Sequence, residues 1–229
     1  MSYFNTLAFG VYPYVAMIIL FVGSWMRYDR EQYTWKASSS QLLEKKQLRM
    51  GSILFHVGVL GIFFGHFFGL LTPVGLWHLL GVTAPMKQMV AMGAGGLFGL
   101  ICFAGLTILI KRRLGNPRIR ATSKKMDIVI LFLLYAQLLL GLFSILVSAG
   151  HLDGEEMMAL MMWAQNIMTL DLADAVQHIA HVHWIYKAHV VLGMTLFVVF
   201  PFTRLVHMFS APVQYVTRQH QIVRKRFAR

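Results

Sequence analysis

Long apolar runs separated by short polar stretches dominate the sequence. Five of these runs are long enough to cross a bilayer core of roughly 30 Å, which takes about 20 helical residues. Runs of this length fit helices rather than the shorter, tilted strands of a membrane barrel. The pattern predicts an all-α integral membrane bundle of five transmembrane helices, with spans at about 4–25, 51–71, 89–110, 128–147 and 184–209.

The composition supports a membrane protein. The 229 residues are 57% hydrophobic and only 13% charged, and the mean hydropathy is +0.61, which leaves little material for the polar surface of a soluble domain. There is no Gly/Ser linker, internal repeat or low-complexity segment, so residues 1–229 are expected to form one domain. The first twenty residues contain no Lys or Arg, so we expect the first run to be an anchor rather than a cleaved signal.

The basic residues predict how the chain is oriented. Nineteen of the 21 Lys and Arg residues fall just after the first span, in the third loop or in the last part of the chain, all on one side of the predicted membrane. The opposite side holds Lys87, Lys187 and the acidic loop 150–183. Because basic loops stay in the cytoplasm, the N-terminus is predicted to be periplasmic and the C-terminus cytoplasmic.

This placement also bears on binding partners. The formal net charge of +12 would suggest nucleic acid in a soluble protein, but the basic loops are explained by orientation and by attraction to anionic lipid. The basic tail 210–229 is long enough to dock a cytoplasmic partner as well.

Histidine is the residue type on which a metal centre would have to depend. The one cysteine, Cys102, allows neither an internal disulfide nor a cysteine-ligated cluster. Polar residues in hydrocarbon are costly and are usually functional. Two histidines in the second span and two in the fifth match the need of two bis-imidazole iron sites, although each could instead hydrogen-bond a neighbouring helix: His56, His66, His189 and His207.

Depth in the membrane predicts how these histidines pair. The second span enters from the cytoplasmic side, so His66 lies about 15 Å further out than His56. The fifth span runs the other way, which pairs His66 with His189 and His56 with His207. Residues 189 and 207 are separated by five helical turns and would project from one face. Their helical rise of about 27 Å, however, exceeds the rise of about 15 Å between His56 and His66. We expect tilt and a kink at Pro201 to absorb the difference.

Glycines and basic residues near these histidines are candidates for cofactor contacts. Four glycines form a stripe on the second span that could pack against a helix or admit a porphyrin edge or quinone ring: Gly58, Gly61, Gly65 and Gly69. The "GAGG" at 93–96 is weaker evidence of the same kind. Lys87 could reach the interface or donate to a quinone carbonyl. Lys187 could meet a haem propionate on the outer side, and Arg112 and Arg113 could do so on the inner side.

The remaining histidines are expected to be solvated or interfacial. His178, His181 and His183 precede the fifth span, in a loop or a short interfacial helix, without an HExxH-type motif. His78, His151 and His220 lie in loops or the tail.

Four segments resemble the gamma subunits of bacterial membrane-bound respiratory nitrate reductases. They are "VYPYVAMIILFVGSWMRYDREQYTWKASSSQ", "LFHVGVLGIFFGHFFGLLTP", "KRRLGNPRIRAT" and "KAHVVLGMTLFVVFPFTRLVHMFSAPVQYVTR". The resemblance covers nearly the whole chain and is weakest at 72–86 and 150–183.

The resemblance implies a di-haem cytochrome b in the bacterial inner membrane that oxidises menaquinol or ubiquinol. It makes His66 and His189 the ligands of the outer haem, and His56 and His207 those of the inner haem. It places the quinol near Gly65, His66, Gly69 and Lys87. Electrons would leave to an iron–sulfur beta subunit on the cytoplasmic face, and then to a molybdenum alpha subunit that reduces nitrate.

Other functions fit the residues alone. A proton or metal transporter could use four intramembrane histidines as a relay, and a haem-free anchor would need none of them. Cytochrome subunits of hydrogenases and formate dehydrogenases share the general plan.

Overall fold

The computed structural model describes residues 3–37 and 39–210, which form helices and no strand. Within these described residues, five helical segments are long and apolar enough to cross a membrane, as predicted: Tyr3–Arg30, Lys46–Leu71, Ala84–Gly115, Lys125–Ser148 and Trp184–Phe202. The last four contain α4 (Lys46–Leu71), α6 (Ala84–Gly115), α8 (Lys125–Ser148) and α11 (Trp184–Val199). Of the predicted tail 210–229, residues 211–229 lie outside the described residues, and His220 is among them.

The first spanning segment combines two kinds of helical turn. Its α-helical parts are α1 (Tyr3–Asn5), α2 (Tyr12–Ile18) and α3 (Ser24–Arg30), and they alternate with π-helical η1 (Thr6–Val11) and η2 (Ile19–Gly23). A short 3-10 turn, η3 (Gln32–Thr34), follows. Pro13 lies inside the continuous segment Tyr3–Arg30 and has no N–H to donate to the Phe9 carbonyl four residues earlier.

Several helices extend beyond the apolar runs that predict them. Helix α6 begins at Ala84, where the Thr83 side chain accepts a hydrogen bond from the Met86 backbone N–H and Pro85 occupies the first turn. It continues to Gly115 and therefore includes Arg112 and Arg113. The hydrophobic pattern gives the length of a membrane crossing, whereas the helix continues until its backbone is capped.

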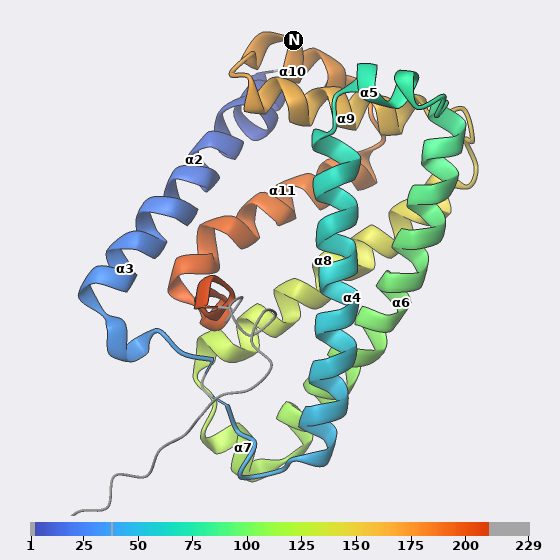
Figure 1. The fold of residues 1–229 in the computed structure, drawn as a ribbon. Coiled ribbons are helices and arrows are strands. Elements are labelled where there is room, and N and C mark those ends of the chain that lie inside the picture. The colour runs from blue at the N-terminus through green and yellow to red at the C-terminus, as the bar shows by residue number, and fades with distance from the viewer. Residues whose placement is uncertain (1–2, 38, 211–229) are drawn as a thin grey trace, which may run out of the picture.

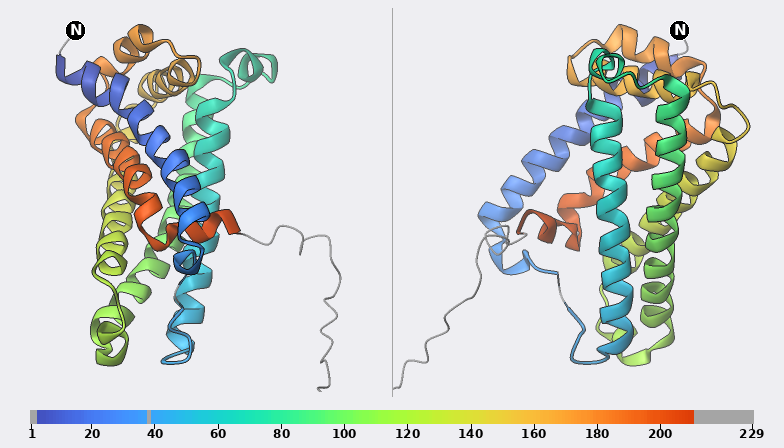
Figure 2. Two further views of the ribbon diagram at one scale, coloured as in Figure 1. Left: turned by 90° about the vertical axis from the view of Figure 1, so that its left-hand side faces the viewer. Right: turned by 45° about the vertical axis from the view of Figure 1, so that its right-hand side comes forward.

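The fifth span differs from the prediction. Instead of one helix over 184–209, α11 ends at Val199 and two 3-10 segments follow, η4 (Phe200–Phe202) and η5 (Arg204–Ser210). Pro201 cannot donate a backbone hydrogen bond and its ring opposes continuation of the helix. Figure 2 shows η5 turning away from the axis of α11. The predicted common helical face of residues 189 and 207 is therefore wrong.

The spanning helices pack as neighbours in the order α4, α6, α8, α11 and α2. Figure 1 and Figure 2 show α4 and α6 side by side along most of their length. Glycines allow this approach: a methyl group at Gly58 would lie 2.5 Å from the Cys102 backbone nitrogen, and one at Gly105 would lie 2.3 Å from that of Phe55. Close backbone contact through small residues is typical of membrane helices.

Short helices cover one end of the bundle (Figure 1): α5 (Val74–Leu79), α9 (Glu155–Met168) and α10 (Leu172–Ala180). Helices α9 and α10 occupy most of the acidic segment that we expected to be a loop. Their apolar faces share a buried cluster with Phe9, and the Trp163 indole donates to the Phe9 carbonyl at 2.9 Å. The opposite end carries the short α7 (Pro117–Ala121).

Candidate functional site

Four histidines form two pairs between α4 and the last part of the chain. The ring centroids of His66 (α4) and His189 (α11) lie 6.1 Å apart at an interplanar angle of 36°. Those of His56 (α4) and His207 (η5) lie 6.3 Å apart at 75°. We call the first the outer pair and the second the inner pair. The structure thus brings together the histidines that were expected, from their depth in the membrane, to lie at the same level.

The break after α11 makes both pairs possible. His56 and His66 are ten residues apart on one continuous helix, a rise of about 15 Å. A continuous helix from 189 to 207 would rise about 27 Å. Because α11 ends at Val199 and η5 turns away, His207 lies against His56 instead of beyond it.

Backbone carbonyls orient three of the four rings. The Nδ1–H of His56 donates to the Ser52 carbonyl at 2.7 Å, and that of His66 donates to the Ile62 carbonyl at 2.9 Å. His207 Nδ1 pairs in the same way with the Arg204 carbonyl. With Nδ1 engaged, the Nε2 atom of each ring carries the free lone pair, as in many metal-ligating histidines.

His189 has different partners. Its Nε2 lies 3.3 Å from the Gln137 amide nitrogen, which also donates to the His189 carbonyl at 3.1 Å. The His189 Nδ1 and Gln137 Oε1 atoms are both buried without a hydrogen-bond partner. Buried polar atoms without partners are costly. A group bound to the His189 ring would therefore change the hydrogen bonding between His189 and Gln137.

The spacing of both pairs fits an iron held between two imidazoles. Metal–imidazole bonds are about 2 Å long, so one ion bound on both sides separates ring centroids by roughly 6 Å. Within residues 3–37 and 39–210, no group of three or more His, Cys, Asp or Glu residues could hold a metal. Two protein nitrogens suffice for haem, since the porphyrin supplies the other four ligands.

The glycine stripe on α4 divides into two parts. Methyl groups at Gly58 and Gly61 would meet Cys102 and Phe98 on α6 at 2.5 Å and 2.4 Å, so these glycines serve helix packing. Gly65 and Gly69, beside His66, face no atom within 4 Å, and the same holds for Gly93 and Gly96 of the "GAGG" motif. His56 and His66 are themselves exposed. Within the stripe, Gly65 and Gly69 are therefore the positions that leave open space for a flat group.

Lys87 is buried rather than directed to the interface. Its side chain is 7% exposed, its Nζ lies 4.6 Å from the centroid of the Trp77 ring, and it contacts the Met161 sulfur. An ammonium has three N–H donors, and an aromatic ring and a thioether sulfur are weak acceptors, so Lys87 can still donate a hydrogen bond to another group. Its predicted contact with a quinol stays a prediction.

Arg112 has several hydrogen-bond partners close in sequence to α4. Its guanidinium donates to the Glu44 carboxylate at 2.7 Å and to the Ser40 hydroxyl at 2.9 Å, and also to both backbone carbonyls. The Gln47 backbone N–H and the Arg112 guanidinium hold the pKa of Glu44 below its ordinary value. The structure therefore shows Arg112 holding the loop before α4, and its predicted propionate contact would require some of these bonds to be exchanged.

The other candidates cap helices or lie at the surface. Lys187 Nζ donates to the Ala180 carbonyl at the end of α10, and His183 caps the start of α11. His178 is half-buried in α10, and His181, the residue after this helix, is exposed. His78 lies in α5 and His151 follows α8.

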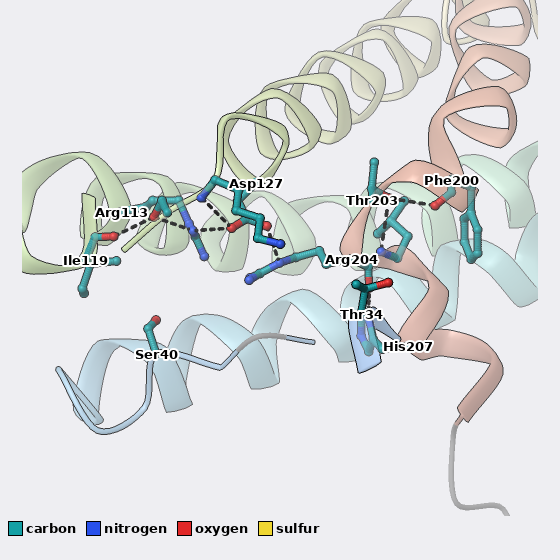
Figure 3. A network of polar contacts seen from close by, with 12 residues as sticks. Thr34, Ser40, Arg113, Ile119, Asp127, Phe200, Thr203, Arg204 and His207 are labelled. Atoms are coloured by element: carbon teal, nitrogen blue, oxygen red, sulfur yellow. Dashed lines mark hydrogen bonds and ion pairs between the residues drawn. The ribbon is translucent and has the colours of Figure 1, made fainter. Parts of the chain in front are cut away.

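Two polar residues near the histidine pairs were not among the candidates predicted from the sequence. Gln137 is a polar position in an otherwise apolar run, and Asp127 is the one acidic residue beside the basic third loop. Figure 3 shows Asp127 between Arg113 and Arg204. Arg204 is three residues before His207 in the chain. The sequence signal for both residues is a single polar or acidic position in an apolar or basic segment.

The chain is similar to known proteins along nearly its whole length. Residues 5–226 match the family described as nitrate reductase gamma subunit. The chain is 50% identical over 226 residues to the respiratory nitrate reductase 1 gamma chain of Escherichia coli, covering 99% of this chain and 100% of that protein. It is 39% identical to the nitrate reductase gamma chain of Bacillus subtilis, covering 95% and 96%. The chain therefore belongs to the nitrate reductase gamma subunit family, the cytochrome b component of respiratory nitrate reductase, and is a multi-pass protein of the inner membrane.

Proposed function

We propose that the chain oxidises a membrane quinol and conducts its electrons across the membrane on two b-type haems. The outer pair, His66 and His189, would hold one haem, and the inner pair, His56 and His207, the other. The observation that carries this proposal is the centroid spacing of 6.1 Å and 6.3 Å in the two pairs. Both values match one metal ion between two imidazoles.

The residues of the chain prepare both sites. Carbonyls of Ser52, Ile62 and Arg204 accept the Nδ1 protons, which leaves the Nε2 lone pairs of three of the rings available to a metal. Such hydrogen bonds fix the tautomer and raise ligand basicity. When bound, the haems supply one-electron carriers at two depths, with potentials tuned by burial and hydrogen bonding.

The quinol would bind beside the outer pair. Gly65 and Gly69 leave space next to His66, and Lys87 offers an ammonium donor in a buried setting with Trp77. A planar quinol needs room for its ring and a donor for its oxygen. Oxidation gives two electrons and two protons, and we propose that the protons leave at the end covered by α5, α9 and α10.

The other end of the bundle would face the cytoplasm and deliver the electrons. It carries the third loop with seven basic residues and Arg27, Lys45 and Lys46, and basic loops remain cytoplasmic. We propose that an iron–sulfur beta subunit docks there and passes electrons to a molybdenum alpha subunit. Transfer toward the cytoplasm with proton release outside would build membrane potential.

A spectrum of the purified protein tests the proposal directly. We expect the reduced-minus-oxidised visible difference spectrum to show b-type haem, and haem extraction to give two per chain. Added menaquinol or ubiquinol analogues should reduce both. A purified, folded chain without haem would leave only the role of an anchor, and haem that quinols cannot reduce would refute the quinol site.

A further inference from the structure

The segment that carries His207 is joined to α11 by an irregular connection that side chains must stabilise. Pro201 ends the helical hydrogen bonding, so carbonyl groups near it lack helical partners. The Arg27 guanidinium of α3 donates to the carbonyls of Pro201 and Thr203. The Thr203 hydroxyl donates to the Phe200 carbonyl at 3.0 Å and accepts from the Leu205 N–H at 3.2 Å.

Beyond this connection, the far end of η5 is held by Trp35, whose indole donates to the Ser210 hydroxyl and whose ring stacks on Phe209. η5 is a seven-residue 3-10 segment, and 3-10 hydrogen bonding is weaker than α-helical bonding. Val206 is its one buried residue, in a small cluster with Leu20 and Phe200. The start of η5, which carries Arg204, is anchored by polar contacts.

Asp127 at the start of α8 supplies such a contact. Its Oδ1 accepts from Arg204 Nε at 3.0 Å, while its Oδ2 lies 3.6 Å from Arg113 Nη1 and accepts from the Lys124 N–H at 3.1 Å. Asp127 is 8% exposed, so the carboxylate is shielded from water, which strengthens its interactions with both guanidinium groups. Figure 3 shows this carboxylate bridging α6 and η5 through the two arginines.

Arg204 connects this carboxylate to the inner pair. Its side chain is fixed by Asp127, and its backbone carbonyl accepts the Nδ1–H of His207. The same residue therefore anchors η5 to α8 and orients the imidazole that faces His56. The contacts run without interruption from Asp127 through Arg204 to His207.

We infer that Asp127 is a positioning residue for the inner haem ligand His207 and acts through Arg204. This inference rests on the proposed function, because it assumes that His207 binds haem. The carboxylate sets where η5 begins, and with it the height and rotation of the His207 ring. Arg113 holds the carboxylate from the other side.

The test is an Asp127→Asn variant of the full complex, with the two haems resolved by optical redox titration. His207→Ala and His189→Ala identify which component is inner and which is outer. We expect Asp127→Asn to shift the potential of the component missing in His207→Ala and to weaken its retention about 10-fold. The outer component should be unchanged, and Asp127→Glu, which keeps the charge, should restore most of the inner signal.

A matched control separates the two sides of Asp127. Ser123→Ala removes a hydroxyl that accepts from Arg113 Nη1 at 2.7 Å but leaves the contact between Asp127 and Arg204 intact. The inner haem should be normal in this variant. An inner haem as strongly shifted in Ser123→Ala, an unchanged inner haem in Asp127→Asn, or equal changes in both haems would overturn the inference.

Two further outcomes are also decisive. If Asp127→Asn does not accumulate, Arg204→Lys is measured instead, since it keeps a charge but loses the guanidinium geometry. A shift confined to the inner component supports the inference and its absence refutes it. If the wild-type protein holds no haem, the proposed function fails and this inference fails with it.

Discussion

The imidazole of His66 on α4 faces that of His189 on α11, with 6.1 Å between their ring centroids. The two residues are more than a hundred positions apart in the chain, and their helices are separated in the packing order by α6 and α8. Their approach therefore joins two helices that are not neighbours in this order. The inner pair repeats the relationship at 6.3 Å, with an imidazole from η5 rather than from a membrane-spanning helix.

Single substitutions of the four histidines are expected to fall into two groups. His66→Ala and His189→Ala should each remove the same haem, and His56→Ala and His207→Ala the other, because each iron needs both of its imidazoles. Haem content and the reduced difference spectrum of each purified variant measure this. Loss of the same component in His66→Ala and His56→Ala would contradict the pairing.

Lys87→Met should weaken quinol binding without affecting either haem. Loss of a charged hydrogen bond costs about 1.5–3 kcal/mol, which corresponds to roughly a 10- to 100-fold rise in KM for the quinol. Steady-state quinol oxidation by the complex and a haem spectrum of the same sample check both statements. A normal KM would remove Lys87 from the quinol site, and Lys187→Met, which affects a helix cap, serves as the control.

Gln137→Leu should perturb the outer haem alone. Its amide nitrogen contacts both the ring and the carbonyl of His189, and hydrogen bonds between membrane helices contribute about 0.6–2 kcal/mol. We expect a modestly lower unfolding temperature together with a changed spectrum of the outer haem. Gln88→Leu, which removes bonds to the Ser148 and His151 carbonyls, should lower stability without the spectral change.

Gly58→Ala should loosen the contact between α4 and α6. A methyl group there would lie 2.5 Å from the Cys102 backbone nitrogen, and overpacking of this kind costs about 1–3 kcal/mol. Cys102 is the only cysteine and is buried, so a thiol-reactive dye reports unfolding of this interface. The dye should react at lower temperature in Gly58→Ala. Gly93→Ala, which faces no atom within 4 Å, should behave as the wild type.

Glu44→Gln should remove a stabilising contribution that depends on pH. The Gln47 N–H and Arg112 hold the pKa of Glu44 below its ordinary value of 4.5. A lowered pKa in the folded state means that the contribution is present above 4.5 and is lost as the pH falls through the lower value. The difference in unfolding temperature between wild type and variant should therefore be present at neutral pH and vanish in acid. A difference that is independent of pH would rule out this origin.

The sequence by itself determined the five spans, apart from the end of the fifth, and the order of the four histidines along the second and fifth. Hydrophobic runs specify helices because a backbone in lipid must satisfy its own hydrogen bonds, and helical rise converts positions 56 and 66 into depths. The family resemblance rested on the same segments. These properties depend on local sequence, so no tertiary contact was needed to predict them.

Only the tertiary structure decided how the histidines approach and which polar residues support them. The end of α11 before Pro201 and the turn into η5 bring His207 against His56, and the contacts of Arg27 and Asp127 that hold this turn join residues far apart in sequence. Likewise, four equivalent glycines on α4 divided into packing and open positions only when α6 was placed beside them. Contacts between distant segments depend on the shape of the whole bundle, which helical periodicity along one span does not contain.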